Sequence, residues 1–176
     1  MSCCEKLDLK KIIRNIPDFP KPGILFYDIT TLLSNKAAFA QTIDALAEEF
    51  KDKKIDSVVA VEARGFIFGG ALAHKLGAGF IPVRKKGKLP WKTNAATYQL
   101  EYGTDTLEMH NDAIRPGERI LIVDDLLATG GTVKAVTELI NQQGGKVAGI
   151  AFAIELTGLK GKDKLKDYPV YSLLKY

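Results

Sequence analysis

The sequence predicts an α/β fold in which helices flank a mainly parallel central sheet. Continuous apolar stretches at 57–61 and 119–123 are typical of strands that are buried on both faces. Helical patterns of apolar residues alternate with these stretches, and such alternation is typical of a parallel sheet. The 176 residues, of which 46% are hydrophobic, suffice for one domain with a substantial core.

The N-terminal region is predicted to be a short helix followed by an extended segment. Apolar residues recur from Leu9 to Ile16 at the i, i+3, i+4, i+7 spacing of an amphipathic helix, which Pro17 would stop. Three prolines and Gly23 fall within residues 16–30. Since proline fixes φ and lacks a backbone N–H, no regular structure is expected there.

Helices and strands then alternate along the chain. The expected helices are one with apolar residues between Phe39 and Phe50, one that ends near Gly77, and one that ends at Gly144. Ser34 or Asn35 is the expected N-cap of the first of these helices. The expected strands are 57–61, 79–84, 119–123, 146–156 and 169–174.

A polar stretch from Lys85 to Asp112 interrupts the alternation between the strands at 79–84 and 119–123. Its length and polarity predict a hairpin or flexible flap rather than a second domain.

Composition limits the possible partners and locations. The net charge of +4 is too small to indicate nucleic-acid binding, and no apolar run is long enough for a membrane helix. The first residues contain no apolar region of the kind found in signal peptides. Cys3 and Cys4 are adjacent, where a mutual disulfide would be strained, so reduced thiols and a cytoplasmic location are expected.

Residues 123–132, VDDLLATGGT, follow the buried run 119–123 and carry the main functional signal. Gly130 and Gly131 leave the backbone open, so the amides of residues 128–132 and the positive end of the next helix can face one anion. The hydroxyls of Thr129 and Thr132 add donors. Asp124 and Asp125 would repel an anion but accept hydrogen bonds from a diol, so a ribose 5-phosphate suits both halves of the motif.

The alternative interpretation is a tight turn whose glycines have no ligand and whose acids cap the helix. A P-loop is excluded because G-x-x-x-x-G-K-[ST] does not occur, and the dinucleotide pattern G-x-G-x-x-G is absent too.

The stretch ILIVDDLLATGGT resembles the phosphoribosyl-pyrophosphate motif of the type I phosphoribosyltransferases. FPKPGILFYDIT, EARGFIFG, PVRKKGKLP, YQLEYG and AIELTGLKG are similar to stretches of the family members that act on adenine. Together these stretches span residues 19–161 in the expected order.

This resemblance implies the type I phosphoribosyltransferase fold in a single domain, 1–176, with a hood at 1–34 that binds the base and a catalytic flap at 85–104. It implies transfer of phosphoribosyl from phosphoribosyl pyrophosphate (PRPP) to adenine, giving AMP and pyrophosphate. Mg²⁺ would arrive with PRPP, near Asp124 and Asp125 and without a dedicated protein site. A homodimer in which Arg84 or its neighbours reach the partner's site is also implied.

The resemblance also implies roles for single residues. Arg64 would act in catalysis and grip pyrophosphate, for which a salt bridge to Glu62 is the structural alternative. Lys85 and Lys88 would contact pyrophosphate, while a solvated basic patch is the alternative. Glu101 would accept the purine proton, and Tyr102 would contact substrate from the same flap.

The base pocket would be formed by Leu25, Phe26 and Tyr27, with Leu156 on the other face of the ring. Many family members have arginine at the position of Tyr27, and Phe26 alone could equally be a core aromatic. Two other functions remain open: transfer to another purine, and sensing of PRPP by a DNA-binding regulator. The region before Pro17 is too short for a helix-turn-helix domain, which weighs against the regulator.

Overall fold

The computed structural model describes residues 6–99 and 104–176. Cys3 and Cys4 lie outside these residues, so the cytoplasmic location stays a prediction. The chain divides into two compact units, residues 1–45 and 46–176. Within the described ranges, no helix is long and apolar enough to cross a bilayer.

The first unit is built from short elements. They are α1 (Leu9–Ile12), β1 (Arg14–Ile16), β2 (Phe26–Asp28), α2 (Thr30–Ser34) and the beginning of α3 (Lys36–Phe50). Strands β1 and β2 are antiparallel, with Asn15 opposite Tyr27. The side-chain amide oxygen of Asn35 accepts hydrogen bonds from the backbone N–H groups of Ala37 and Ala38, both at 3.1 Å, so the predicted cap of α3 is confirmed.

The prediction for residues 9–30 is wrong in two respects. The first helix ends at Ile12 instead of Ile16, and part of the expected irregular segment forms strand β2. The Thr31 hydroxyl explains the early end of the helix, because it accepts from the Arg14 N–H at 3.2 Å and donates to the Ile12 carbonyl at 2.6 Å. Pairing with β2 then provides hydrogen-bond partners for backbone N–H and C=O groups of β1.

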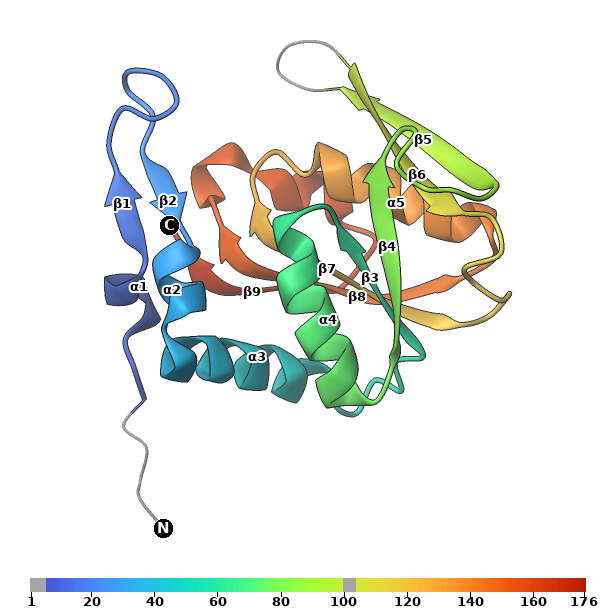
Figure 1. Cartoon of the computed structure of the whole chain (residues 1–176), viewed down its shortest axis with the longest axis horizontal. Coiled ribbons are helices and arrows are strands. Elements are labelled where there is room, and N and C mark those ends of the chain that lie inside the picture. Colours follow the sequence, from blue (N-terminus) through green and yellow to red (C-terminus); the bar gives the residue numbers. More distant parts are fainter. Residues whose placement is uncertain (1–5, 100–103) are drawn as a thin grey trace. The chain divides into compact units, whose positions relative to one another are not determined.

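The second unit contains a seven-stranded sheet of order β5-β6-β4-β3-β7-β8-β9 (Figure 1). The strands are β3 (Ser57–Val61), β4 (Gly79–Lys85), β5 (Thr93–Gln99), β6 (Thr104–His110), β7 (Arg119–Leu127), β8 (Lys146–Glu155) and β9 (Val170–Lys175). Strands β4, β3, β7, β8 and β9 are parallel, whereas β6 pairs antiparallel with β4 and β5. The mainly parallel sheet and the hairpin after β4 confirm the predictions.

Two helices cover opposite faces of this sheet. Figure 1 shows α4 (Arg64–Leu76) in front of the sheet and α5 (Gly131–Gln142) behind it. Successive residues of a strand contact opposite faces of the sheet, because their side chains point alternately to the two sides. Ile120 and Ile122 belong to the cluster that includes the apolar face of α5.

The front helix lies close to the sheet because it contains glycine. A Cβ atom built on Gly69 would lie 2.5 Å from the Cβ atom of Ala60 in β3. The helix ends at Leu76, where Gly77 takes a left-handed conformation with φ 66°, as the sequence predicted. The connection from β8 to β9 contains the short 3₁₀ helices η1 (Thr157–Leu159) and η2 (Gly161–Leu165).

Candidate active site

A cavity of about 290 Å³ lies at the carboxyl ends of β3 and β7. In the sheet, β4 lies on one side of β3 and β7 lies on the other. The chain thus adds strands first on one side of β3 and then on the other, and β3 marks the switch point. Ligands of open α/β sheets bind at such switch points. The cavity is lined by residues 61–64, by Asp124, Asp125, Leu126, Ala128 and Thr132, and by Lys85, Tyr98 and Leu107.

The aspartate pair lies on a half-paired part of strand β7. Pairing of β7 with β3 ends at Val123, whereas pairing with β8 continues to Leu127. Asp124 and Asp125 therefore border the cavity on the side that β3 leaves open. The sequence placed the end of this strand at Val123, which is wrong, because the pattern of apolar residues cannot show that pairing to β8 continues.

The glycine corner, residues 128–132, connects β7 to α5. Gly130 is the N-cap of α5 and has φ 77°, a left-handed conformation that favours glycine. Among the described residues, none accepts a hydrogen bond from the backbone amides of Thr129 to Thr132. Ala128 and Thr132 line the cavity. The structure therefore provides the predicted set of open amides at the positive end of a helix.

Arg64 begins α4 and forms an ion pair with Asp125. Its Nε atom lies 2.8 Å from the Oδ2 atom of Asp125, whose side chain is 9% exposed. The alternative predicted for Arg64, a salt bridge to Glu62, is not the pair that forms. Asp125 lies within reach because Ala60 of β3 is in register with Val123 of β7.

Asp124 is half-buried beside the cavity and lies next to a second carboxylate, that of Asp125. Burial and the neighbouring carboxylate of Asp125 raise the pKa of Asp124 well above its ordinary value. The Asp124 Oδ1 atom accepts a hydrogen bond from the backbone N–H of Asp125 at 2.9 Å. A Cβ atom on Gly65 would lie 2.8 Å from this same oxygen, so glycine at position 65 leaves the space that the Asp124 carboxyl fills.

A second group of charges borders the cavity at the end of β4. The Arg84 Nε atom donates to the Glu62 Oε2 atom at 2.7 Å, and the Lys85 backbone N–H donates to Oε1 at 3.1 Å. Although burial opposes ionisation, these hydrogen bonds lower the pKa of Glu62. Arg84 also donates to the Lys88 carbonyl at 3.1 Å.

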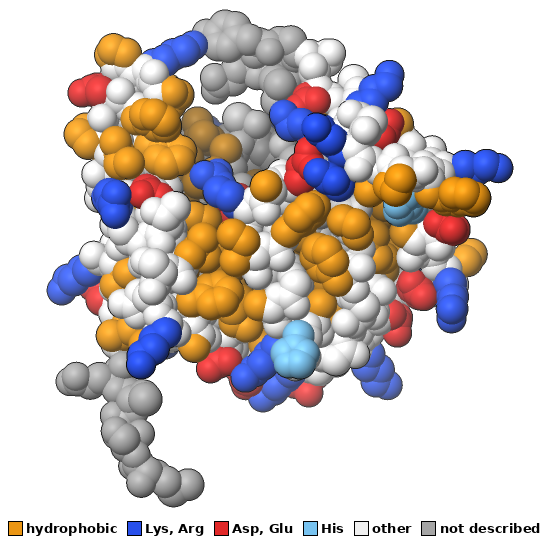
Figure 2. Space-filling model, in the orientation of Figure 1, with side chains coloured by type: hydrophobic (Ala, Val, Ile, Leu, Met, Phe, Trp, Pro, Cys, Tyr) orange, Lys and Arg blue, Asp and Glu red, His pale blue; other side chains and the backbone are white. Residues whose placement is uncertain are grey.

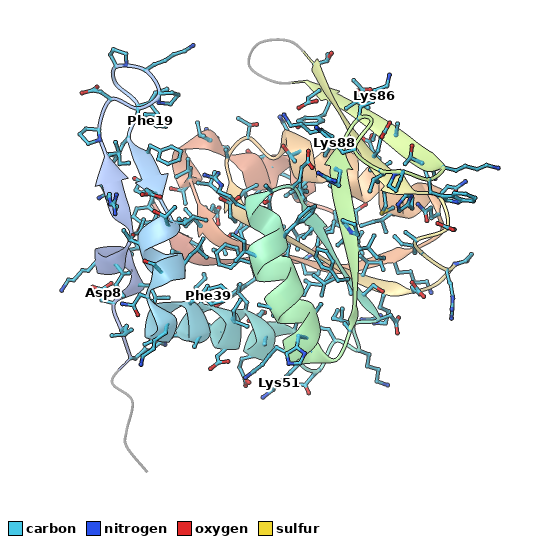
Figure 3. All side chains as sticks on the ribbon, in the orientation of Figure 1. Asp8, Phe19, Phe39, Lys51, Lys86 and Lys88 are labelled. Atoms are coloured by element: carbon cyan, nitrogen blue, oxygen red, sulfur yellow. The ribbon has the colours of Figure 1, made fainter. Side chains whose placement is uncertain are left out.

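Of the two lysines predicted to contact pyrophosphate, the structure places Lys85 at the cavity. Its Nζ atom lies 3.1 Å from the Oδ2 atom of Asp105 in β6, and this carboxylate raises the pKa of Lys85. Lys88 does not line the cavity, although its charge lowers the pKa of Glu62, which does; the two lysines Lys86 and Lys88 follow β4 (Figure 3). Asp105 was missed from the sequence, where only its opposite sign to the nearby lysines could have indicated it.

The remaining predicted substrate contacts belong to other parts of the chain. Glu101 and Tyr102 lie outside the described residues. Leu25, Phe26 and Tyr27 belong to the first unit, where Phe26 makes an edge-to-face contact with Phe19 at a ring distance of 5.1 Å. Leu156 belongs to the second unit and follows β8, with its backbone N–H donating to the Leu127 carbonyl at 2.9 Å.

Comparison with known proteins assigns the class. Residues 28–175 match the model of the phosphoribosyl transferase domain. This chain, whose mainly parallel sheet carries a carboxylate pair and a glycine corner at its switch point, is thus a phosphoribosyltransferase. The relatives define the group more closely. The chain is 61% identical over 173 residues to the adenine phosphoribosyltransferase of Acidobacterium capsulatum, covering 98% of this chain and 94% of the relative. It is therefore a member of the adenine phosphoribosyltransferase family.

Solved structures agree with this assignment. The adenine phosphoribosyltransferase of Thermoanaerobacter pseudethanolicus superposes with a TM-score of 0.93 at 53% identity, covering 96% of this chain and 98% of that one. The Saccharomyces cerevisiae enzyme, in a complex with an iminoaltritol bisphosphate and adenine, gives a TM-score of 0.89 at 45% identity, covering 94% of this chain and 96% of that one.

Replacing Asp124 by asparagine is expected to stabilise the ligand-free protein at neutral pH while weakening substrate binding. As the pH rises, the unfolded state loses the Asp124 proton first, because the pKa is raised in the folded state. The wild type therefore loses stability from the ordinary aspartate pKa up through the raised one, and asparagine does not. We expect the variant to melt about 2–4 °C higher at pH 7, a gain of about 1 kcal/mol.

Melting curves between pH 4 and pH 8 measure this effect, and the difference should shrink towards pH 4. Asp163→Asn is the control, because the Asp163 side chain is 62% exposed in η2. A stability difference that does not change with pH would contradict the role of a raised pKa.

Proposed function

We propose that this protein transfers the 5-phosphoribosyl group of PRPP to adenine, releasing pyrophosphate and forming AMP in purine salvage. The observation that carries the proposal is the glycine corner next to the half-paired aspartates of β7. Open amides at 129–132 suit the 5-phosphate, and the carboxylates of Asp124 and Asp125 suit the ribose hydroxyls. The choice of adenine is supported by the relatives, which are adenine phosphoribosyltransferases.

In the proposed reaction, the bond from ribose C1 to the pyrophosphate oxygen breaks and a bond from C1 to adenine N9 forms. The electron pair of the breaking bond leaves with pyrophosphate, and positive charge develops on the ribose. Arg64 and Lys85 border the cavity and would neutralise the leaving group. Glu101 would take the proton that N9 loses.

Binding pyrophosphate requires an exchange of ionic partners. Arg64 is held by Asp125 and Lys85 by Asp105. Pyrophosphate carries more charge than one carboxylate, so it can compete for both cations. We propose that adenine is recognised by Leu25, Phe26, Tyr27 and Leu156. Tyr27 would contribute backbone groups only, which leaves its difference from the common arginine without effect on adenine recognition.

We propose Mg²⁺ as the cofactor that accompanies PRPP. In the described ranges, no group of three or more His, Cys, Asp or Glu side chains could hold a metal ion. Asp124 and Asp125 alone would supply two carboxylates, which fits Mg²⁺ held mainly by phosphate oxygens and water. The ion would neutralise charge on pyrophosphate, while the protein positions its oxygens.

The test is formation of nucleotide from PRPP, Mg²⁺ and each of adenine, guanine and hypoxanthine, with product and pyrophosphate measured together. AMP and pyrophosphate should appear in equal amounts with adenine, and addition of EDTA should stop the reaction. Turnover with guanine or hypoxanthine in preference to adenine would exclude adenine as the substrate. PRPP binding without any turnover would favour a sensor of PRPP.

We further propose that two copies of the chain form a homodimer through the face of α4 and β4. Figure 2 shows hydrophobic side chains gathered over α4 and its border with β4. Ile67 and Phe80 are 43% and 40% exposed, and Phe80 makes an edge-to-face contact with Phe66. An exposed apolar patch of this kind is typical of a protein interface.

Replacing both Ile67 and Phe80 by aspartate is expected to convert the dimer to a monomer, because four charges would be buried at a twofold interface. Light scattering after gel filtration measures the mass. Trp91→Ser is the control, since Trp91 is 63% exposed and lies in the connection between β4 and β5. A dimer that survives the double substitution would exclude this face.

A further inference from the structure

The connection between β8 and β9 touches the glycine corner through backbone atoms. Gly161, the first residue of η2, is buried. A Cβ atom built on Gly161 would lie closer than 3.0 Å to the Ala128 carbonyl oxygen and 2.9 Å from the Leu127 side chain. Side-chain Cβ atoms are essentially never found so close to another atom. Glycine at position 161 is therefore what lets the two backbones meet.

The contact is reciprocal. A Cβ atom built on Gly130 would lie 2.5 Å from the Gly161 carbonyl oxygen and 3.4 Å from its Cα atom. Gly130 and Gly161 thus face each other with no side chain between them. The backbone of the corner therefore packs directly against η2.

Three anchors hold the connection in place. The Lys162 Nζ atom lies 3.0 Å from the Oε2 atom of Glu155, a residue that is 7% exposed at the end of β8. Although burial opposes ionisation, the neighbouring Ser172 hydroxyl and Lys162 ammonium group lower the pKa of Glu155. Leu165 is 1% exposed, and the Leu156 N–H donates to the Leu127 carbonyl at 2.9 Å.

We propose that residues 157–165, the buttress segment, fix the position of the phosphate-binding amides, with Gly161 and Lys162 as positioning residues. The peptide group is planar, so the Ala128 carbonyl and the Thr129 N–H move as one unit. A side chain at position 161 that pushes this carbonyl aside also turns the Thr129 amide away from the phosphate. This inference rests on the proposed function, because it assumes that the corner binds the 5-phosphate.

Two glycines of the same segment provide a matched test. Gly161→Ala introduces a clash with the corner, whereas Gly158→Ala has no atom within 4 Å to meet. For Gly161→Ala we expect KM for PRPP to rise by about tenfold to a hundredfold, the equivalent of one lost hydrogen bond to a charged phosphate. KM for adenine should change less, and Gly158→Ala should match the wild type in both constants.

The ion pair gives a second and milder test. Lys162→Met removes the ion pair with Glu155 and should raise KM for PRPP several-fold. Lys162→Arg keeps the positive charge and should have a KM for PRPP close to that of the wild type. Lys166→Met is the control, since Lys166 is 72% exposed and its ion pair is with the exposed Asp163. If Gly161→Ala fails to fold, the comparison of the three lysine variants decides the question.

Calorimetric titration with ribose 5-phosphate separates this inference from the proposed function, because it needs no turnover. If the wild type forms no AMP but binds ribose 5-phosphate more tightly than Gly161→Ala does, the proposed function is wrong, whereas the proposed role of the buttress segment is supported. If the wild type forms AMP and a folded Gly161→Ala has the KM of Gly158→Ala, the buttress is overturned. A lowered melting temperature with unchanged KM would likewise reduce Gly161 to a structural role.

Discussion

Replacing Gly130 by alanine is expected to weaken PRPP binding by about 100-fold or more. The left-handed backbone at φ 77° costs alanine about 1–2 kcal/mol, and its Cβ atom would meet the Gly161 carbonyl at 2.5 Å. The corner must therefore change its path. Loss of two amide contacts to phosphate, at about 1.5–3 kcal/mol each, accounts for a 100-fold effect. Titration with ribose 5-phosphate measures the change.

Gly117→Ala separates backbone strain from the clash. Gly117 has φ 88°, but no atom lies within 4 Å of a Cβ atom built on it. It should lose stability by about 1–2 kcal/mol without any change in affinity. If Gly130→Ala behaves in the same way, the corner does not bind the phosphate and the proposed function loses its main support.

Replacing Glu101 by glutamine is expected to lower kcat by about 10²–10⁴, the usual contribution of a general base. This corresponds to about 2.7–5.5 kcal/mol of the barrier. Glutamine keeps the size of the side chain but cannot accept the N9 proton. PRPP affinity should stay nearly unchanged, because the 5-phosphate and pyrophosphate are bound by other groups. Single-turnover measurements of AMP formation, together with the Kd for PRPP, test both statements.

Glu138→Gln is the control, since Glu138 is an exposed residue of α5. A wild-type kcat for Glu101→Gln would remove this residue from the mechanism. An equal loss of kcat and of PRPP affinity would instead indicate a binding role.

The sequence predicted the second unit well because its signals are local. Strand β3 has the predicted bounds, and the end of α4 at Gly77 follows from the conformation that glycine favours. The glycine corner was predicted as well, since Gly130 and Gly131 stand at the start of a clearly amphipathic helix. In each case the residues that determine the structure are close in sequence.

Features that depend on distant residues were not predicted. Strand β1 exists because β2 pairs with it, and apolar spacing alone suggested a helix there. The structural alternative for Arg64, a salt bridge to its neighbour Glu62, was wrong, because the register of β3 and β7 places Asp125 beside Arg64. The contact of Gly161 with the corner joins segments about thirty residues apart and leaves no local pattern.

The ion pair between Arg64 and Asp125 has a consequence for product release. The Asp125 carboxylate holds the Arg64 guanidinium within the fold, so part of the side-chain entropy of this arginine, about 2 kcal/mol, is lost on folding rather than on binding. After the proposed transfer, the Asp125 carboxylate competes with the departing diphosphate for the Arg64 guanidinium. Because this carboxylate is part of the chain, it can pair with Arg64 again as soon as the diphosphate moves away, and this favours dissociation of the product.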